Sequence, residues 1–448
     1  MVQLPTPTVV GVARQGGIVV ECQVKRMIAR YSLAMLVALM SVTAMALKTP
    51  ETSDCFEKFV DPVSGVVSYL LKPGLFGHNQ QSLYYTQKAM TDDGRFLVFV
   101  VSPDETEKEY FKRQHLAVLD FLTDKVTVLD DFRAGTVTPY LDVKTDEICY
   151  LDRYSEDRGL FKRSLLGDVK KPTKICDFPE SAAKLGQRIG SMYTHLTRTA
   201  DGNGFFLDLQ VRVKDAPKKE DRVMMSVLGV LDAGTGTFTE WYRNQYIVRH
   251  AAANPRRKDV ALALEPYWET HKEVHDCGKT GVCKRLLLLS PGKSELIVGQ
   301  VPPGGKPPVH VVHTEWTADG SGIYWCSYEN GVILHNIDTG KEEVLMKDNR
   351  AVHCEMTDDN RYIVFDQSAV ERQFRGQSWK VGFYDRVTQK TSWIYTKSPE
   401  LMTPEKPSKL HPDPHPNFAM GDRYAICTMN VKERQLSVLV TPTAQFKH

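Results

Sequence analysis

A short polar turn followed by an apolar strand recurs along most of the chain. The first copy runs from Thr-Asp-Asp-Gly at 91–94 into Arg-Phe-Leu-Val-Phe at 95–99. An Asp-Gly or Asp-Asn pair supplies the positive φ of a hairpin turn, and alternating β-branched and aromatic residues favour a strand. Seven copies, spaced by about 40 to 65 residues as in propeller blades with loop insertions, begin at residues 91, 144, 199, 254, 317, 357 and 421.

A second hairpin follows most copies of this repeat. Examples are the apolar stretches at 116–120, 227–232 and 332–337, the last two of which end in Gly-containing turns. Two hairpins make one four-stranded blade. The repeat therefore predicts an all-β protein folded as a seven-bladed β-propeller, with six or eight blades, or two β-domains, as the alternatives.

The two ends of the chain predict how the ring is closed. The last repeat is one strand short, whereas the apolar segment 66–71 near the start is a strand without a blade. We expect this N-terminal strand to complete the last blade, because a closed ring leaves no exposed sheet edge.

The first 46 residues differ from the rest. Lys25, Arg26 and Arg30 precede an apolar run at 31–42 that ends in Ala-Met-Ala at 44–46. This pattern is typical of a secretory signal peptide with an A-x-A cleavage site. It predicts a signal peptide and upstream residues over 1–46, a single propeller domain over 47–448, and export to the periplasm or the extracellular space. A buried N-terminal helix is the alternative.

Composition narrows the possible partners. Lys and Arg number 57 against 55 Asp and Glu, so no overall basic field attracts nucleic acid or an anionic membrane. The sequence has no phosphate-binding Gly-rich loop, no G-x-S-x-G elbow and no nucleic-acid-binding signature. The apolar run at 31–42 is too short to span a bilayer, and no later stretch approaches the length that a span needs. In an oxidising compartment, Cys277 and Cys283 could form a local disulfide.

Histidines precede five of the seven repeats. A single histidine is more often a hydrogen-bonded core residue than a ligand, but similar positions in successive blades predict that these side chains meet at one axis. Imidazole is a common ligand of transition metals, and a carboxylate suits a harder ion such as manganese. The densest cluster is Leu-His-Pro-Asp-Pro-His-Pro at 410–416, whose prolines favour an extended chain with Asp413 and His415 on one face. The histidines are His195, His250, His310, His313, His353, His411 and His415.

Several stretches resemble the oligogalacturonate lyases, which are seven-bladed propellers that cleave short pectin fragments by β-elimination. The resemblance covers nearly all of the chain after residue 46. It includes Asp-Pro-Val-Ser-Gly at 61–65, Gly-His-Asn at 77–79 and Tyr-Tyr-Thr-Gln at 84–87. The stretches that carry chemistry are His-Thr-Glu-Trp at 313–316 and Asp-Pro-His-Pro-Asn-Phe at 413–418.

The resemblance implies a metal site that holds a divalent ion, typically manganese. His313 and His415 match ligand histidines of that family. The family has a histidine where Asp413 stands and a glutamine where Leu410 stands, so two of its four ligands are replaced. Asp413 remains able to bind a metal, and His411 is expected as a further ligand in place of Leu410.

The resemblance also implies a catalytic base. His250, in Val-Arg-His at 248–250, matches the histidine that removes the C5 proton of a uronate. This proton is acidic enough only when a metal or an arginine neutralises the neighbouring carboxylate. Strand alternation turns Arg249 away from His250, so Arg198 is the arginine predicted to assist catalysis.

Together these residues predict a polysaccharide lyase that carries out metal-assisted β-elimination, a carbon–oxygen bond cleavage, on short oligogalacturonate-like substrates. One alternative is a non-catalytic propeller that binds sugars or proteins at the same channel. Another is a lyase or hydrolase for a different polysaccharide. The expected partner is an oligosaccharide, with no nucleic acid and no membrane span, and the oligomeric state is left open.

Overall fold

The computed structural model divides into two units, Met1–Leu47 and Lys48–His448, and every described strand lies in the second. The predicted cleavage point lies beside this division, and cleavage itself stays a prediction. No helix among the described residues is long and apolar enough to cross a membrane. The structure describes residues 46–108, 110–130, 139–152, 156–184, 187–192, 196–214, 223–244, 248–264, 286–298, 311–328, 330–348, 350–368, 379–399, 410, 413–432 and 435–447.

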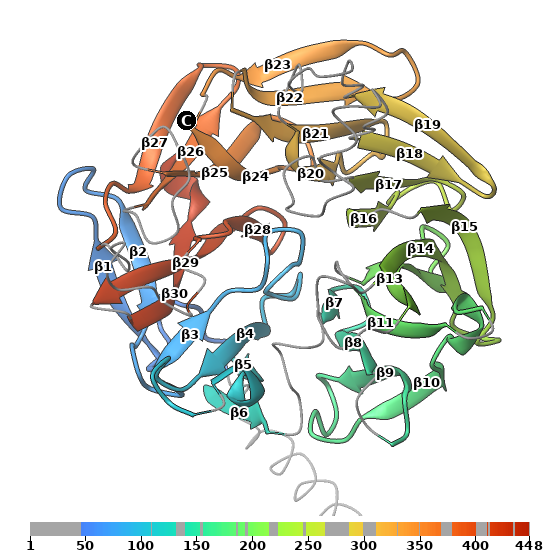
Figure 1. Ribbon diagram of the computed structural model, residues 1–448. Coiled ribbons are helices and arrows are strands. Elements are labelled where there is room, and N and C mark those ends of the chain that lie inside the picture. The colour runs from blue at the N-terminus through green and yellow to red at the C-terminus, as the bar shows by residue number, and fades with distance from the viewer. Residues whose placement is uncertain are drawn as a thin grey trace, which may run out of the picture. The chain divides into compact units, whose positions relative to one another are not determined.

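The described strands of the second unit form seven antiparallel sheets around a central axis (Figure 1), which confirms the predicted seven-bladed propeller. Blade 1 contains β3 (Asn79–Gln81), β4 (Phe96–Ser102), β5 (His115–Asp120) and β6 (Lys125–Leu129). Blade 2 contains β7 (Tyr140–Asp142), β8 (Glu147–Asp152), β9 (Gly159–Ser164) and β10 (Thr173–Asp177). Blade 3 contains β11 (Arg188–Met192), β12 (Thr197–Arg198), β13 (Gly204–Lys214), β14 (Val223–Asp232) and β15 (Phe238–Asn244).

The remaining blades carry most of the candidate site. Blade 4 contains β16 (Arg249–Ala253), β17 (Ala261–Leu264), β18 (Leu286–Ser290) and β19 (Lys293–Val298). Blade 5 contains β20 (Val312–Trp316), β21 (Gly322–Ser327), β22 (Gly331–Asn336) and β23 (Glu342–Met346). Blade 6 contains β24 (Ala351–Met356), β25 (Tyr362–Ser368), β26 (Trp379–Asp385) and β27 (Lys390–Tyr395). Blade 7 contains β28 (Asn417–Ala419), β29 (Tyr424–Lys432) and β30 (Gln435–Pro442), to which β2 (Val67–Leu71) and β1 (Phe56–Val60) add.

The predicted repeat is the turn between the innermost strand of a blade and the next strand outward. In blade 1 the Thr91 hydroxyl donates to Asp93 Oδ1 at 2.7 Å and accepts the Phe96 amide at 3.0 Å. Because the threonine and aspartate side chains bind within the turn, the sequence alone encodes its shape. The same threonine–aspartate hydrogen bond, 2.6 to 2.8 Å long, closes the turns that begin at Thr199, Thr317 and Thr357.

The sheets stack face to face, so their middle strands are covered on both sides. All six residues of β21 are buried, whereas the first three residues of the outer strand β23 are exposed. Tyr324 of blade 5 and Phe365 of blade 6 belong to one apolar cluster between the two sheets. Burial of each such side chain stabilises the fold by about 1.5 to 3 kcal/mol. This packing explains why the middle strands are nearly continuous apolar runs.

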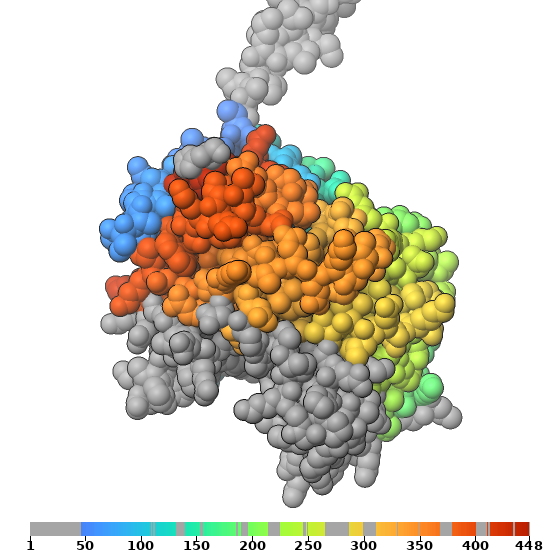
Figure 2. Space-filling view, turned by 90° about the horizontal axis from the view of Figure 1, so that it is seen from above, coloured from blue at the N-terminus to red at the C-terminus, as the bar shows by residue number. Residues whose placement is uncertain are grey.

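The N-terminal segment closes the ring, as predicted, but it does so with two strands. Strand β2 pairs with β30 through Tyr69 opposite Val440, and β1 pairs with β2 on the outside of the sheet. The hydroxyls of Ser68 and Thr441 are 2.8 Å apart across this junction. Figure 2 shows these blue N-terminal strands beside the orange and red C-terminal part of the chain. Blade 7 therefore has five strands and contains both ends of the propeller.

The predicted disulfide between Cys277 and Cys283 lies outside the described residues. Short 3₁₀ turns are the only helical elements in the described part of the chain, and three of them are η1 (Tyr110–Arg113), η2 (Glu180–Ala182) and η4 (Thr443–Gln445).

Candidate functional site

Four histidine rings from four consecutive blades meet at the centre of the propeller. His250 lies on β16, His313 on β20, His353 on β24, and His415 just before β28. The ring centroids are 5.7 Å apart for His250 and His313, 3.9 Å for His313 and His353, and 4.4 Å for His353 and His415. The predicted convergence is therefore present for these four, while His195, His310 and His411 lie outside the described residues.

Three of these histidines have a left-handed backbone. The φ angles are 48° at His250, 51° at His313 and 48° at His415. The strand register shifts at the first two sites, between Arg249 and Ala252 and between Val312 and Glu315. A bulge of this kind inserts one residue and redirects a side chain. The backbone therefore accepts a local strain of about 1 to 2 kcal/mol at each position while the imidazole is directed toward the axis.

His353 is held by a buried carboxylate. Its Nδ1 lies 2.9 Å from Asp366 Oδ2, and its backbone amide donates to Asp366 Oδ1 at 2.8 Å. The His415 amide donates to the same carboxylate at 3.2 Å. The Asp366 side chain is 0% exposed and that of His353 2%. Because a carboxylate accepts, the proton belongs on Nδ1 and leaves the Nε2 lone pair as the potential metal ligand.

A potential metal-binding group forms beside this histidine. One ligand atom from each of His353, Asp413 and His415 lies within 4.8 Å of the others. Ligands of a common ion, at bonds of about 2.1 to 2.5 Å, lie up to roughly 4 to 5 Å apart. Two imidazoles and a carboxylate suit a divalent transition metal, so the donor set fits a manganese-like ion. Two of the predicted ligands, Asp413 and His415, are therefore brought together.

The predicted ligand His313 lies next to this group. Its Nδ1 is 2.6 Å from the Val352 carbonyl, which can only accept, so Nδ1 donates and Nε2 carries the lone pair. Its ring is 3.9 Å from that of His353. Sequence reasoning did not assign a ligand role to His353, whereas it did assign one to His411, which lies outside the described residues.

Leu410 is packed into a small apolar cluster with Tyr110 and Leu436. Leu410 is 3% exposed, and its hydrocarbon side chain has no donor atom for a metal. The chain position that carries a ligand glutamine in the resembled family thus serves packing in this protein.

Two tyrosines from the loop after β3 pack against the histidines. Tyr85 is 1% exposed, its hydroxyl donates to the Thr314 carbonyl at 3.3 Å, and its ring is 5.2 Å from that of His353. Tyr84 is half-buried, and its ring centroid lies 4.5 Å from His415 and 6.0 Å from His250. Tyr84 therefore touches the rings at both ends of the histidine row, a position that the sequence did not indicate.

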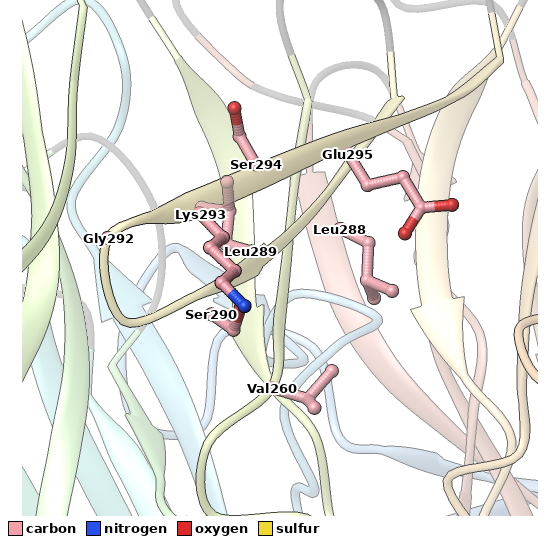
Figure 3. Close-up of a pocket in the computed structure, with 8 residues that line it drawn as sticks. All are labelled: Val260, Leu288, Leu289, Ser290, Gly292, Lys293, Ser294 and Glu295. Carbon is pink, nitrogen blue, oxygen red and sulfur yellow. The ribbon is translucent and has the colours of Figure 1, made fainter.

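A cavity opens on this side of the site. Its volume is about 190 Å³, and its lining consists of Gln81, Ser82, Tyr84, His415 and Thr428. Hydroxyl and amide groups beside an aromatic ring are suited to a polar, ring-shaped ligand such as a sugar. A larger cavity of about 550 Å³ lies at the outer hairpin β18–β19 (Figure 3), where its lining contains no histidine and its charged residues are Lys293 and Glu295.

A partly buried ion pair lies close to the same inner strands. Lys88 Nζ is 2.6 Å from Glu355 Oε1 and donates to the Phe418 carbonyl at 3.1 Å. Glu355 follows His353 by two residues on β24, so this pair anchors the strand that carries the histidine. On β20, burial raises the pKa of Glu315 from 4.5 to about 8. The surrounding protein therefore disfavours the charged form of this carboxyl group.

Arg198 joins blade 2 to blade 3. Its Nε lies 2.7 Å from Asp142 Oδ2, its NH1 donates to the Gly202 carbonyl at 2.9 Å, and its guanidinium lies over the Phe205 ring at 4.7 Å. Among the described residues, none of these contacts connects Arg198 to the histidines. Its predicted catalytic role stays a prediction.

The comparisons with known proteins support the fold. No protein-family model and no curated protein matches this chain. An oligogalacturonate lyase solved in complex with manganese superposes with a TM-score of 0.64 and 17% identity, over 88% of this chain and 97% of its own. An oligogalacturonate lyase from Vibrio parahaemolyticus superposes with a TM-score of 0.64 and 15% identity, over 87% and 96% of the two chains. The resemblance read from the sequence is thus confirmed as a shared propeller fold.

Proposed function

We propose that this protein is a metal-assisted lyase that cleaves short uronate oligosaccharides by β-elimination, with His250 as the base. The observation that carries the proposal is that the His250 ring lies 5.7 Å from that of His313. The potential metal-binding group of His353, Asp413 and His415 lies on the other side of His313. A base beside a metal-binding group is what elimination next to a carboxylate requires.

The substrate carboxylate is the group that the site must neutralise. The C5 proton of a uronate is a weak acid because its removal adds a second negative charge beside a carboxylate that is already ionised. A divalent cation, when bound, supplies the positive charge that makes this removal possible. We propose manganese, since imidazole and carboxylate donors suit it and a lyase with the same fold has been solved with manganese.

His250 performs the proton transfer in this proposal. A neutral imidazole accepts the C5 proton, the C4–O bond breaks, and a C4=C5 double bond forms in the new end of the sugar. The departing oxygen takes up a proton, which His250 or water returns. Tyr84, whose ring lies 6.0 Å from that of His250 and 4.5 Å from that of His415, would contact the sugar between base and metal.

Near-ultraviolet absorbance of the full chain incubated with oligogalacturonates tests the proposal, because the product contains a conjugated unsaturated uronate. We expect the absorbance to rise with added Mn²⁺, to stop after chelation with EDTA, and to resume when Mn²⁺ is restored. A chain that binds Mn²⁺ and oligogalacturonates without any rise would contradict it. A panel of other uronate polymers tests the alternative of a lyase for a different polysaccharide.

A sugar-binding propeller without turnover is the second candidate. It is favoured by Leu410, which contributes packing where a ligand would strengthen the metal site. Saturable binding of oligogalacturonates, measured by calorimetry, with no unsaturated product after prolonged incubation would support this candidate over the lyase.

We also propose that the protein is exported. The apolar run at 31–42, preceded by three basic residues and followed by Ala-Met-Ala, supports a cleaved signal peptide. N-terminal sequencing of protein purified from the periplasm or the medium should begin at Leu47. Retention of the protein in the cytoplasm with residues 31–46 intact would contradict export.

A further inference from the structure

We propose that His353 is a ligand of the metal and that Asp366 is the positioning residue that fixes its ring. The inference rests on the metal site of the proposed function and specifies its composition. In this chain the binding group then consists of His313, His353, Asp413 and His415, one contribution from each of blades 5 and 6 and two from blade 7.

His353 lies close to the other proposed ligands. His353 is the residue that forms a compact group with Asp413 and His415, whose ligand atoms lie within 4.8 Å of one another. His353 is also the nearest ring neighbour of His313, at 3.9 Å between centroids. An ion held by His415 and Asp413 therefore lies within reach of the His353 ring.

Asp366 orients the ring of His353. The Asp366 carboxylate lies 2.9 Å from Nδ1 of His353, which places the proton there and leaves the Nε2 lone pair available to a metal. The carboxylate of Asp366 also accepts the backbone amides of His353 and His415. One buried side chain thus fixes the ring of one ligand and the main chain of another, across the junction between blades 6 and 7.

The inner strand of blade 6 differs locally from those of the neighbouring blades. In blades 4, 5 and 7 the site histidine stands two residues before the strand resumes pairing, at Ala252, Glu315 and Asn417. In blade 6 pairing resumes at Cys354, only one residue after His353, although His353 stands four residues before its repeat turn, as His250 and His313 do.

The histidine of blade 6 is therefore the second residue of the strand irregularity, whereas His250 and His313 are the first residues of theirs. His353 does not have the left-handed φ of the other three histidines, so a different contact must orient its ring. Asp366 provides that contact. The Val352 carbonyl orients His313, because it accepts a hydrogen bond from Nδ1 of His313 at 2.6 Å. Blade 6 therefore sets the orientation of two imidazoles, which gives it a larger part in the site than a single ligand would.

Mn²⁺ binding by the full chain, followed by electron paramagnetic resonance without substrate, tests the inference. We expect His353→Gln to lower Mn²⁺ affinity by at least about 10-fold, and Asp366→Asn to lower it by about 10- to 100-fold. The matched control is His335→Gln, which changes a histidine of β22 outside the site and should leave the affinity unchanged. A folded His353→Gln protein that binds Mn²⁺ as tightly as the unchanged chain, while Asp413→Asn does not, would overturn the proposal.

The positioning role of Asp366 is tested by a measurement that does not change merely because the protein becomes less stable. We expect the visible absorption of the Co²⁺-loaded protein to change in Asp366→Asn, because the His353 ring is free to rotate. Asp366→Glu, which keeps the charge but displaces the acceptor, should give an intermediate spectrum and serves if Asp366→Asn does not fold. Unchanged Co²⁺ spectra and affinity in the folded variants would reduce Asp366 to a packing residue.

These measurements separate the inference from the proposed reaction. A chain that binds Mn²⁺ through His353 but forms no unsaturated product sustains the metal-site assignment and removes the lyase. A chain that binds neither Mn²⁺ nor Co²⁺ overturns the metal-site assignment, whatever its activity.

Discussion

The imidazole of His250 lies 5.7 Å from that of His313 and almost perpendicular to it, at an interplanar angle of 86°. This arrangement places a proposed base directly beside a proposed metal ligand. The two residues come from neighbouring blades, and both have a left-handed backbone conformation. Their chemistry should therefore be separable by mutation.

Replacement of His250 by alanine should remove elimination and spare the metal. We expect the rate of absorbance increase to fall by about 10²- to 10⁴-fold, the usual contribution of a positioned general base, with Mn²⁺ affinity unchanged. The measurement is the initial rate on oligogalacturonates at saturating Mn²⁺, with Mn²⁺ affinity determined on the same sample. An undiminished rate would exclude His250 as the base.

The left-handed backbone at His250 predicts an unusual order of stability. With φ at 48°, glycine fits this position better than alanine, so His250→Gly should be more stable than His250→Ala by about 1 kcal/mol. His353 is the matched control. It does not have a positive φ, so there the glycine variant should be the less stable of the pair, by about 0.5 to 1 kcal/mol. Equilibrium unfolding of the four variants gives both differences, and the same order at both sites would contradict the strain argument.

Tyr84 should contribute to substrate binding rather than to the metal. Its ring forms part of the 190 Å³ cavity, so Tyr84→Ala should raise KM by about 10-fold, equivalent to roughly 1.4 kcal/mol, while Mn²⁺ affinity stays the same. Tyr84→Phe separates the ring from its hydroxyl. Tyr384→Ala, on the distant strand β26, is the control and should leave KM unchanged. Equal KM values for Tyr84→Ala and the unchanged chain would place the sugar elsewhere.

Asp61 should make ring closure sensitive to acid. Burial alone would raise its pKa, but hydrogen bonds from the amides of Ser64, Thr396 and Val63 bring the pKa of Asp61 below the ordinary 3.8. Because Thr396 follows β27 of blade 6, these bonds connect the N-terminal hairpin to the neighbouring blade. A carboxyl group with a lowered folded-state pKa adds stability above about pH 4, and this stability is lost as the pH falls through the folded-state value.

Asp61→Asn should therefore lower the free energy of unfolding by about 1 to 3 kcal/mol at pH 7. The difference from the unchanged chain should shrink as the pH is lowered below 3.8, the ordinary pKa of the group. Denaturant unfolding at a series of pH values measures it. Glu57→Gln, which removes an equal charge from an exposed position of β1, should have little effect at any pH. A constant difference between Asp61→Asn and the unchanged chain across this range would contradict the linkage.

The blades were predictable because their turns are encoded locally. Thr91 and Asp93 are hydrogen-bonded to each other within one turn, so a short stretch of sequence determines the shape of that turn. Strand β1 was not predicted, because the segment 56–60 carries no such turn and its place is determined by β2. Local chemistry thus reveals the repeat, while the fifth strand of blade 7 depends on a partner far along the chain.

The site was predictable only in part, for the same physical reason. His250, His313 and His353 each stand four residues before the start of a repeat, and His415 stands six residues before one, so their convergence followed from the architecture. The ligand position of His353 depends on Asp366, whose hydrogen bond forms only after β24 and β25 have paired. Leu410 packs against Tyr110 and Leu436, and Tyr110 lies some 300 residues earlier in the chain. Periodicity carries no signal for either contact.

Blade 7 contains both Asp413 and His415 and is assembled from the two ends of the propeller. During synthesis β2 is complete at Leu71, yet its partner β30 begins only at Gln435, roughly 360 residues later. At about 5 to 20 residues per second, this strand waits roughly 20 to 70 s with an unpaired edge. The metal-binding group therefore forms only after β30 has been synthesised. A nascent or C-terminally shortened chain has no blade in which to present Asp413 and His415, and exposes instead an edge that is prone to aggregation.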